Sequence, residues 1–107
     1  MNNDWFYDVL RFCNDIWNLC GMRPWCDEDF KHTSGHLEDI IEGEDIYSSN
    51  EIANEYILKK SCYLLDMINR GDNKGDIWNY IVKIRGEWAD IVYCYNLVKF
   101  KRSKENE

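Results

Sequence analysis

A long apolar repeat in the last third of the chain constrains the fold more than any other feature of the sequence. Seven apolar side chains recur there at alternating steps of four and three, namely Ile77, Ile81, Ile84, Trp88, Ile91, Tyr95 and Val98. This spacing places them on one side of an α-helix. Polar residues fall on the opposite side, at Asn79, Lys83, Glu87 and Asp90. So long a helix needs partners to bury its stripe, so the repeat predicts a bundle.

The first forty residues supply two of these partners. Residues 4–20 carry two adjacent apolar stripes, which predict a central helix with Asp4 as a plausible N-cap and Gly21 after its end. Residues 22–35 predict a loop, with a short turn at 27–31. A short second helix is expected over about 35–42, capped by Ser34 and ended by Gly43.

A third helix is expected to run from about residue 50 to Asn69. Ser48 and Glu51 have the spacing of a capping box, and Asn50 is the competing cap. Its expected buried side is Ala53, Ile57, Leu58, Cys62, Leu64, Leu65 and Ile68. Gly71 ends the helix, and Asp76 is expected to cap the final helix, which frays after about residue 100.

The expected fold is therefore all-α, a compact bundle of three long helices and one short helix. The alternative is an α+β fold with a C-terminal β-hairpin, because residues 77–100 are rich in β-branched and aromatic side chains and Gly86 would lie in the turn. The helix is preferred because the polar positions also recur at about 3.6 residues.

Length and composition predict a single soluble domain over residues 1–107. No apolar run is long enough to span a membrane, and the first residues lack the pattern of a signal peptide, so a cytoplasmic location is expected. The five cysteines are accordingly expected to be free thiols. Frequent Asn, Ile, Tyr and Lys, which have AT-rich codons, suggest a phage, a virus or a low-GC bacterium as the source.

Charge is distributed unevenly along the chain. The net charge is −7, which argues against a general nucleic-acid binder because such a protein needs basic surface. Residues 27–55 hold ten carboxylates against the single cation Lys31, a local charge near −9. The tail is basic, with Lys99, Lys101, Arg102 and Lys104.

Two pairs of carboxylates have the spacing that places both members on one helical face. Asp39 and Glu42 form the first pair, and Glu87 and Asp90 form the second. Facing pairs of this kind bind Mg²⁺ through oxygen ligands. In these residues the sequence resembles the MazG-like all-α nucleotide pyrophosphohydrolases, whose pattern is an ExxE pair followed by an ExxD pair. The resemblance implies Mg²⁺-dependent hydrolysis of nucleoside triphosphates, although the first pair here is DxxE.

A second hypothesis is a zinc site formed by Cys20, Cys26, His32 and His36, since zinc accepts two thiolates and two imidazoles. The spacing differs from that of a usual zinc finger. Cys13, Cys62 and Cys94 lie in apolar patterns and are expected to be unreactive packing thiols.

The favoured hypothesis is a small acidic protein–protein interaction module without enzymatic activity, metal or cofactor. It would inhibit a basic, nucleic-acid-handling partner, in the manner of an immunity protein, an antitoxin, or a phage anti-defence or DNA-mimic protein. The expected partner-binding residues are Trp25, Asp27, Glu28, Asp29, Glu38, Glu42, Glu44, Asp45 and Tyr47, with the two aromatic residues as apolar anchors. A homodimer through Tyr56 and Tyr63 is a further possibility.

Overall fold

The computed structural model describes residues 4–20 and 27–105, with the backbone alone at 27–29 and at 105. It contains helices α1 (Trp5–Cys20), α2 (Asp27–Ile41), α3 (Glu51–Asn69) and α4 (Lys74–Glu105). The all-α prediction is confirmed. The alternative β-hairpin is not observed, because residues 77–100 all lie within α4. Among the described residues, no helix combines the length and apolar character needed to cross a bilayer.

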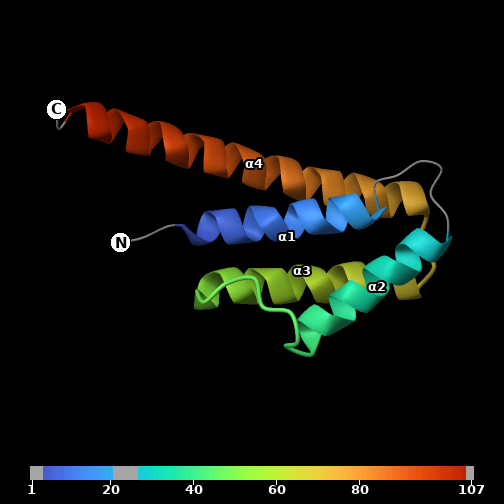
Figure 1. Ribbon diagram of the computed structural model, residues 1–107. Helices are drawn as coiled ribbons and strands as arrows, with labels where there is room; N and C mark the ends of the chain where they lie inside the picture. Colours follow the sequence, from blue (N-terminus) through green and yellow to red (C-terminus); the bar gives the residue numbers. More distant parts are fainter. Residues whose placement is uncertain (1–3, 21–26, 106–107) are drawn as a thin grey trace.

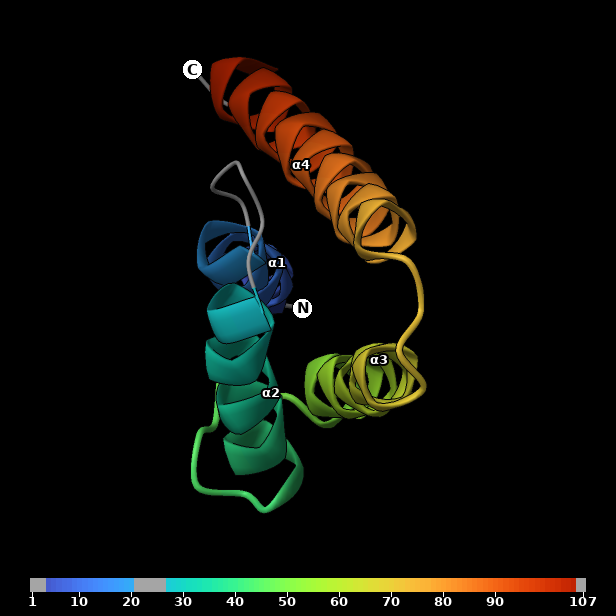
Figure 2. The same ribbon diagram turned by 90° about the vertical axis from the view of Figure 1, so that its right-hand side faces the viewer.

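Helix α1 is the centre of the arrangement. It runs beside α4 on one side and contacts α2 and α3 on the other (Figure 1). Helix α3 runs roughly parallel to α1 and in the same direction, whereas α2 is inclined to both of them (Figures 1 and 2). The C-terminal end of α4 extends beyond the other helices (Figure 1), and the molecule is elongated, with principal extents of 54 × 28 × 15 Å.

One apolar core joins all four helices. Helix α1 contributes Val9, Phe12, Cys13, Ile16 and Cys20, all with no exposed surface. The other helices contribute Phe30, Leu37, Ile40, Ala53, Ile57, Leu64, Met67, Ile77, Ile81, Ile84 and Trp88. The first helix was predicted to have a wide apolar face. In the structure this face packs against three neighbouring helices, and the packing removes it from water.

The buried stripe of α4 departs from the predicted repeat after Trp88. Val92 is 7% exposed, whereas Ile91 is 38% exposed and Val98 is also exposed. A repeat at steps of four and three averages 3.5 residues per turn, and a straight helix has about 3.6, so a strict heptad drifts around the helix. The side of α4 that faces α1 therefore passes from Trp88 to Val92 rather than to Ile91.

Helix α2 is one continuous helix over residues 27–41, which corrects the predicted loop and short helix. Phe30 and Thr33 are buried and extend the stripe of Leu37 and Ile40 towards the N-terminus at helical spacing. The Thr33 hydroxyl lies 3.0 Å from the Cys20 sulfur. A buried, hydrogen-bonded threonine therefore takes the place of an apolar residue, which the apolar pattern alone did not reveal.

Two further local predictions need correction. Asn50, the competing cap, accepts hydrogen bonds from the Ile52 and Ala53 amides, so the capping box at Ser48 is wrong. Asn73 rather than Asp76 caps α4, since its side chain accepts from the Gly75 amide at 2.8 Å. Helix α4 continues to Glu105; fraying after about residue 100 stays a prediction.

The buried side of α3 also differs from the prediction. Leu58 and Cys62 are exposed, while Ser61 and Met67 are buried. The Ser61 hydroxyl oxygen has no hydrogen-bond partner within the part of the chain that the structure describes. A buried hydroxyl without a partner lowers stability, because its bonds to water are lost without replacement.

We therefore expect Ser61→Ala to raise the free energy of unfolding by about 1 kcal/mol, since it removes this hydroxyl and also favours the helix. Urea unfolding followed by circular dichroism measures the change. Thr33→Val is the matched control, because the Thr33 hydroxyl does have a partner in Cys20 and its removal should be destabilising. A loss of stability in Ser61→Ala would contradict the assignment.

Candidate protein-interaction surface

The C-terminal end of α2 folds back on itself and gathers carboxylates. The Gly43 amide donates to the Ile40 carbonyl at 3.1 Å, and the Glu44 amide donates to the Asp39 carbonyl at 2.9 Å. Gly43 has a φ of +82°, which glycine adopts without strain. This turn places Glu44 beside Asp39 and Glu42, and carboxylate oxygens of these three residues lie within 4.8 Å of one another.

The exposed carboxylates around this turn are here called the acidic surface, which consists of Glu38, Asp39, Glu42, Glu44 and Asp45. The last turn of α2 contains no basic residue, although the C-terminal end of a helix favours positive charge. In the described portion of the chain, only Asp45 of these five lies within 4 Å of a basic side chain, the Nδ1 atom of His36. The acidic surface therefore carries negative charge that its own fold does not neutralise.

A chain of hydrogen bonds fixes the segment that follows the turn. The Tyr47 hydroxyl donates to the Asp15 carboxylate at 2.6 Å, and it lies 2.7 Å from Nε2 of His36. Nδ1 of His36 lies 3.2 Å from the Asp45 carboxylate. Arg11 of α1 donates to the Tyr47 carbonyl at 2.7 Å. The acidic surface is thereby connected to α1 and to the middle of α2.

The polar groups of this chain have complementary roles. Burial raises the pKa of Tyr47, and the hydrogen bond to Asp15 raises it further. The hydroxyl therefore remains a donor to Asp15, and its oxygen accepts from Nε2–H of His36. The ring of Tyr47 packs edge-on against Phe12 at 5.7 Å between centroids. Tyr47, predicted as an apolar anchor for the partner, is half-buried, and its hydroxyl and ring hold the acidic segment against α1 and α2.

The apolar residue that does face outwards here is Ile46, which is 72% exposed. It borders a cleft of about 230 Å³ whose wall includes Ile41, Tyr47 and Leu58. Sequence reasoning did not select Ile46. The available signal was its position, an isoleucine in the short acidic segment between two expected helices. The arrangement is an apolar cleft beside a group of carboxylates.

The other predicted contact residues do not join this group. The backbone of Asp27, Glu28 and Asp29 forms the start of α2, about 20 Å of helix away from the acidic surface at a rise of 1.5 Å per residue. Trp25 lies outside the described residues. The acidic third of the sequence is thus divided between the two ends of one helix rather than forming one continuous surface.

The two carboxylate pairs of the enzyme hypothesis are not brought together. Asp39 and Glu42 are exposed at the end of α2, and Glu87 and Asp90 are exposed on α4. Within the described residues the backbones of α2 and α4 do not approach closely, and α1 lies between α2 and the later part of α4 (Figure 2). Their side chains meet at the first turns, where Lys74 lies over the Phe30 ring, away from both carboxylate pairs. The geometry therefore does not supply the facing pairs that the resemblance implies.

The thiols and imidazoles of the zinc hypothesis have other neighbours. Cys20 is buried beside Thr33, and both ring nitrogens of His36 contact Tyr47 or Asp45. His32 is exposed, and Cys26 lies outside the described residues. Burial raises the pKa of Cys13 to about 12, so this thiol remains protonated as predicted for a packing residue. Cys62 and Cys94 are exposed, which corrects their predicted packing role.

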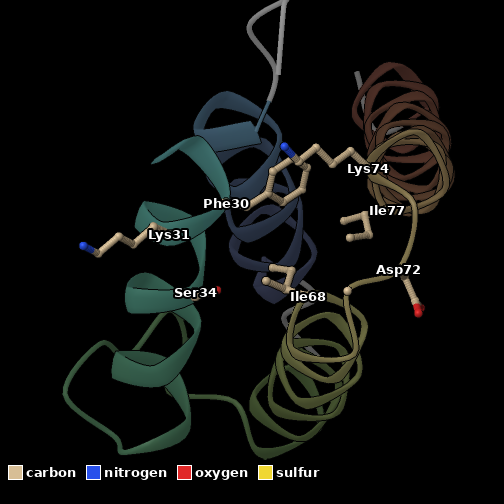
Figure 3. Close-up of a pocket in the computed structure, with 8 residues that line it drawn as sticks. Phe30, Lys31, Ser34, Ile68, Asp72, Lys74 and Ile77 are labelled. Carbon is tan, nitrogen blue, oxygen red and sulfur yellow. The ribbon is translucent and has the colours of Figure 1, made fainter. Parts of the chain in front are cut away.

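A second cleft, of about 400 Å³, lies where α2, α3 and α4 meet. Its floor is apolar, with Ile68 and Ile77, and the Lys74 ammonium lies 5.8 Å from the centre of the Phe30 ring. Lys31 and Asp72 point away from the cleft (Figure 3), and Asp72 is paired with Arg70 at 2.8 Å. The polar groups do not converge as the groups of a catalytic site do.

Comparison of the chain with protein-family models, with curated proteins and with solved structures finds no match.

Proposed function

We propose that this protein is a small acidic interaction module that binds and inhibits a basic, nucleic-acid-handling protein. The acidic surface is the contact region. One observation carries the proposal: carboxylates of Asp39, Glu42 and Glu44 cluster within 4.8 Å at the negative end of a helix, without a cation in its last turn. This arrangement is locally unfavourable, and local rules are broken most often where a surface serves a partner.

The chemistry of the region fits a cationic partner. Clustered carboxylates attract Lys and Arg side chains, speed the diffusional encounter, and occupy positions that phosphates take on a nucleic acid. Ile46 and its cleft supply an apolar centre beside the charges, as in interfaces whose core is apolar and whose rim is polar. The network through Tyr47 holds the segment in place, which limits the entropy lost on binding. Such a protein would act in the cytoplasm, in a host cell if it is encoded by a phage or virus.

Charge reversal at the acidic surface tests the proposal. The variant Glu38→Lys, Glu42→Lys, Glu44→Lys is compared with Glu55→Lys, Asp66→Lys, Glu87→Lys, which has the same net charge but is altered on α3 and α4. Each protein is used as bait in lysate of the source or host cell, and association rates of the captured partner are then measured across ionic strength. We expect the first variant to associate about tenfold or more slowly, with a flatter salt dependence.

The matched control should retain the association rate of the unaltered protein to within a small factor, because its reversed charges lie away from the acidic surface. Equal slowing of both variants would mean that net charge alone attracts the partner. An association rate that is unchanged in the first variant would remove the acidic surface from the contact.

A further inference from the structure

The imidazole of His36 has a polar neighbour at each of its two ring nitrogens. Nε2 lies 2.7 Å from the Tyr47 hydroxyl oxygen, and Nδ1 lies 3.2 Å from the Asp45 carboxylate. The His36 side chain is 22% exposed, whereas that of Asp45 is 50% exposed. The ring therefore joins the middle of α2 to residues 43–49, which connect α2 to α3 (Figure 1).

The donors and acceptors around the ring follow from the carboxylate of Asp15. An ionised carboxylate accepts hydrogen bonds and has no proton to donate, so the Tyr47 hydroxyl donates to Asp15, 2.6 Å away. A phenol has a single proton, which this bond uses. The hydroxyl oxygen must then accept from His36, so Nε2 of His36 carries a proton.

The contact at the other ring nitrogen requires a second proton. The Asp45 carboxylate is also an acceptor, so it bonds to Nδ1 only when Nδ1 carries a proton. A neutral imidazole has one N–H group, and in His36 this group is directed to Tyr47. With a neutral ring, the lone pair of Nδ1 would face a carboxylate oxygen at 3.2 Å, and two acceptors form no hydrogen bond. The imidazolium form of His36 is therefore the form that satisfies both contacts.

We infer that His36 is a pH-sensitive switch: protonation of its ring closes the contact with Asp45 and holds residues 43–49 on α2, and loss of that proton opens the contact. Histidine is the side chain that changes charge between about pH 5 and pH 8. The closed arrangement binds one more proton than the open one, so it is favoured at low pH and is lost as pH rises.

The charged and titratable groups around the ring come from α1, from α2 and from residues 43–49. They are Asp15 and Arg11 of α1, Lys31, His32 and Asp39 of α2, and Asp45 and Tyr47. Both signs of charge are present in this set. Asp45 is the carboxylate that directly contacts the ring, so a change at Asp45 alone tests the switch and leaves the other charges in place.

The switch acts on the surface assigned to the partner, so its consequence for binding rests on the proposed function. Residues 43–49 include Glu44 and Asp45 of the acidic surface and Ile46 beside the apolar cleft. In the closed arrangement these residues are fixed before a partner arrives, whereas in the open arrangement their ordering costs conformational entropy on binding. The change within the chain is measured without a partner, so it is tested separately from the proposed function.

The test uses the full chain, labelled with ¹⁵N, from about pH 5 to pH 8. Ring nitrogen resonances follow the protonation of His36. The amides of Glu44 and Asp45, which donate to the Asp39 carbonyl, report on the segment through their hydrogen-exchange protection, corrected for the intrinsic dependence of exchange on pH. We expect protection at both amides to fall by about threefold or more as Nδ1 loses its proton, with the same midpoint. Protection that does not change across the titration would overturn the inference.

Asp45→Asn separates the switch from a general effect of charge. An asparagine side chain donates to a neutral Nδ1 and accepts from a protonated one, so the contact persists in both states of the ring. We expect protection at the Glu44 amide to become independent of the protonation of His36. Glu42→Gln is the matched control, because it removes the same charge from the acidic surface and should keep the threefold response. A pH response that persists in Asp45→Asn, or that disappears in Glu42→Gln, would overturn the assignment to the contact between His36 and Asp45.

Discussion

Phe12→Ala is expected to lower the free energy of unfolding by about 3–5 kcal/mol, the usual loss when a fully buried phenylalanine is truncated. Phe12 has no exposed surface and lies on α1, the helix that contacts all three others. Its ring also supports the ring of Tyr47, 5.7 Å away. A domain of this size has a total stability of roughly 5–15 kcal/mol, so the variant should lie close to unfolding.

Equilibrium unfolding in urea, followed by far-ultraviolet circular dichroism, measures this loss. Phe100→Ala is the matched control, because it removes the same side chain from an exposed position on α4. Measured at concentrations where the protein is monomeric, it should change stability by no more than about 0.5 kcal/mol. Similar losses in the two variants would mean that Phe12 does not occupy the centre of the core.

The strongest periodic patterns predicted the helices best. Residues 4–20 were predicted as one helix, and α1 spans Trp5–Cys20. The prediction succeeded because two adjacent apolar stripes repeat at the helical period and not at the period of a strand. The end of α2 at Gly43 and the end of α3 at Gly71 were also predicted, and both glycines have positive φ. In these cases the local signal and the tertiary packing agree.

The predictions failed where tertiary contacts override local propensity. Residues 27–34 are mostly polar and were predicted as a loop, yet Phe30 and Thr33 are buried. Thr33 contacts Cys20 of α1, and Lys74 of α4 lies over the Phe30 ring. The buried hydroxyl of Thr33 contributes as a core residue only because Cys20 lies beside it. The contact between Cys20 and Thr33, thirteen positions apart in the chain, cannot be predicted from the periodicity of apolar residues.

The candidate site was predicted by charge but not by geometry. Glu38, Glu42, Glu44 and Asp45 were correctly expected to be exposed. The turn at Gly43 that gathers the carboxylates depends on backbone hydrogen bonds, and the support by Asp15 and His36 depends on contacts across three segments. Sequence composition reports the amount of charge, whereas the arrangement of that charge follows from the packing of α1 against α2.

The second large effect is expected at Tyr47, the residue that connects this surface to the core. Tyr47→Ala should lower the free energy of unfolding by about 3 kcal/mol or more, because it removes a half-buried ring that packs on Phe12 as well as a hydrogen-bonded hydroxyl. Tyr47→Phe keeps the ring and removes only the hydroxyl, so it should cost about 1–2 kcal/mol. The difference between the two variants separates packing from the polar network.

Tyr47→Phe also tests whether the network holds the acidic segment in place. Without the hydroxyl, Asp15 and Nε2 of His36 lose their contacts with the segment, while the His36–Asp45 contact and the Arg11 bond to the residue 47 carbonyl remain. Amide hydrogen exchange over residues 43–49 should therefore become faster, while exchange in α4 stays the same. All carboxylates remain in this variant. Partner association should therefore keep its rate and salt dependence, and dissociation should become faster. Unchanged exchange over residues 43–49 would mean that the segment is fixed by its backbone alone.

Alkaline pH gives an independent measure of the same network. The pKa of Tyr47 is raised above its ordinary value of 10.0, mainly by burial. Above about pH 10 the unfolded chain releases this proton while the folded chain retains it, so the folded state binds more protons and stability falls as pH rises. Tyr47→Phe has no proton to lose at this position. The stability of the unaltered protein should consequently fall more steeply above pH 10 than that of Tyr47→Phe, and parallel pH profiles would show that the hydroxyl is not buried in the network.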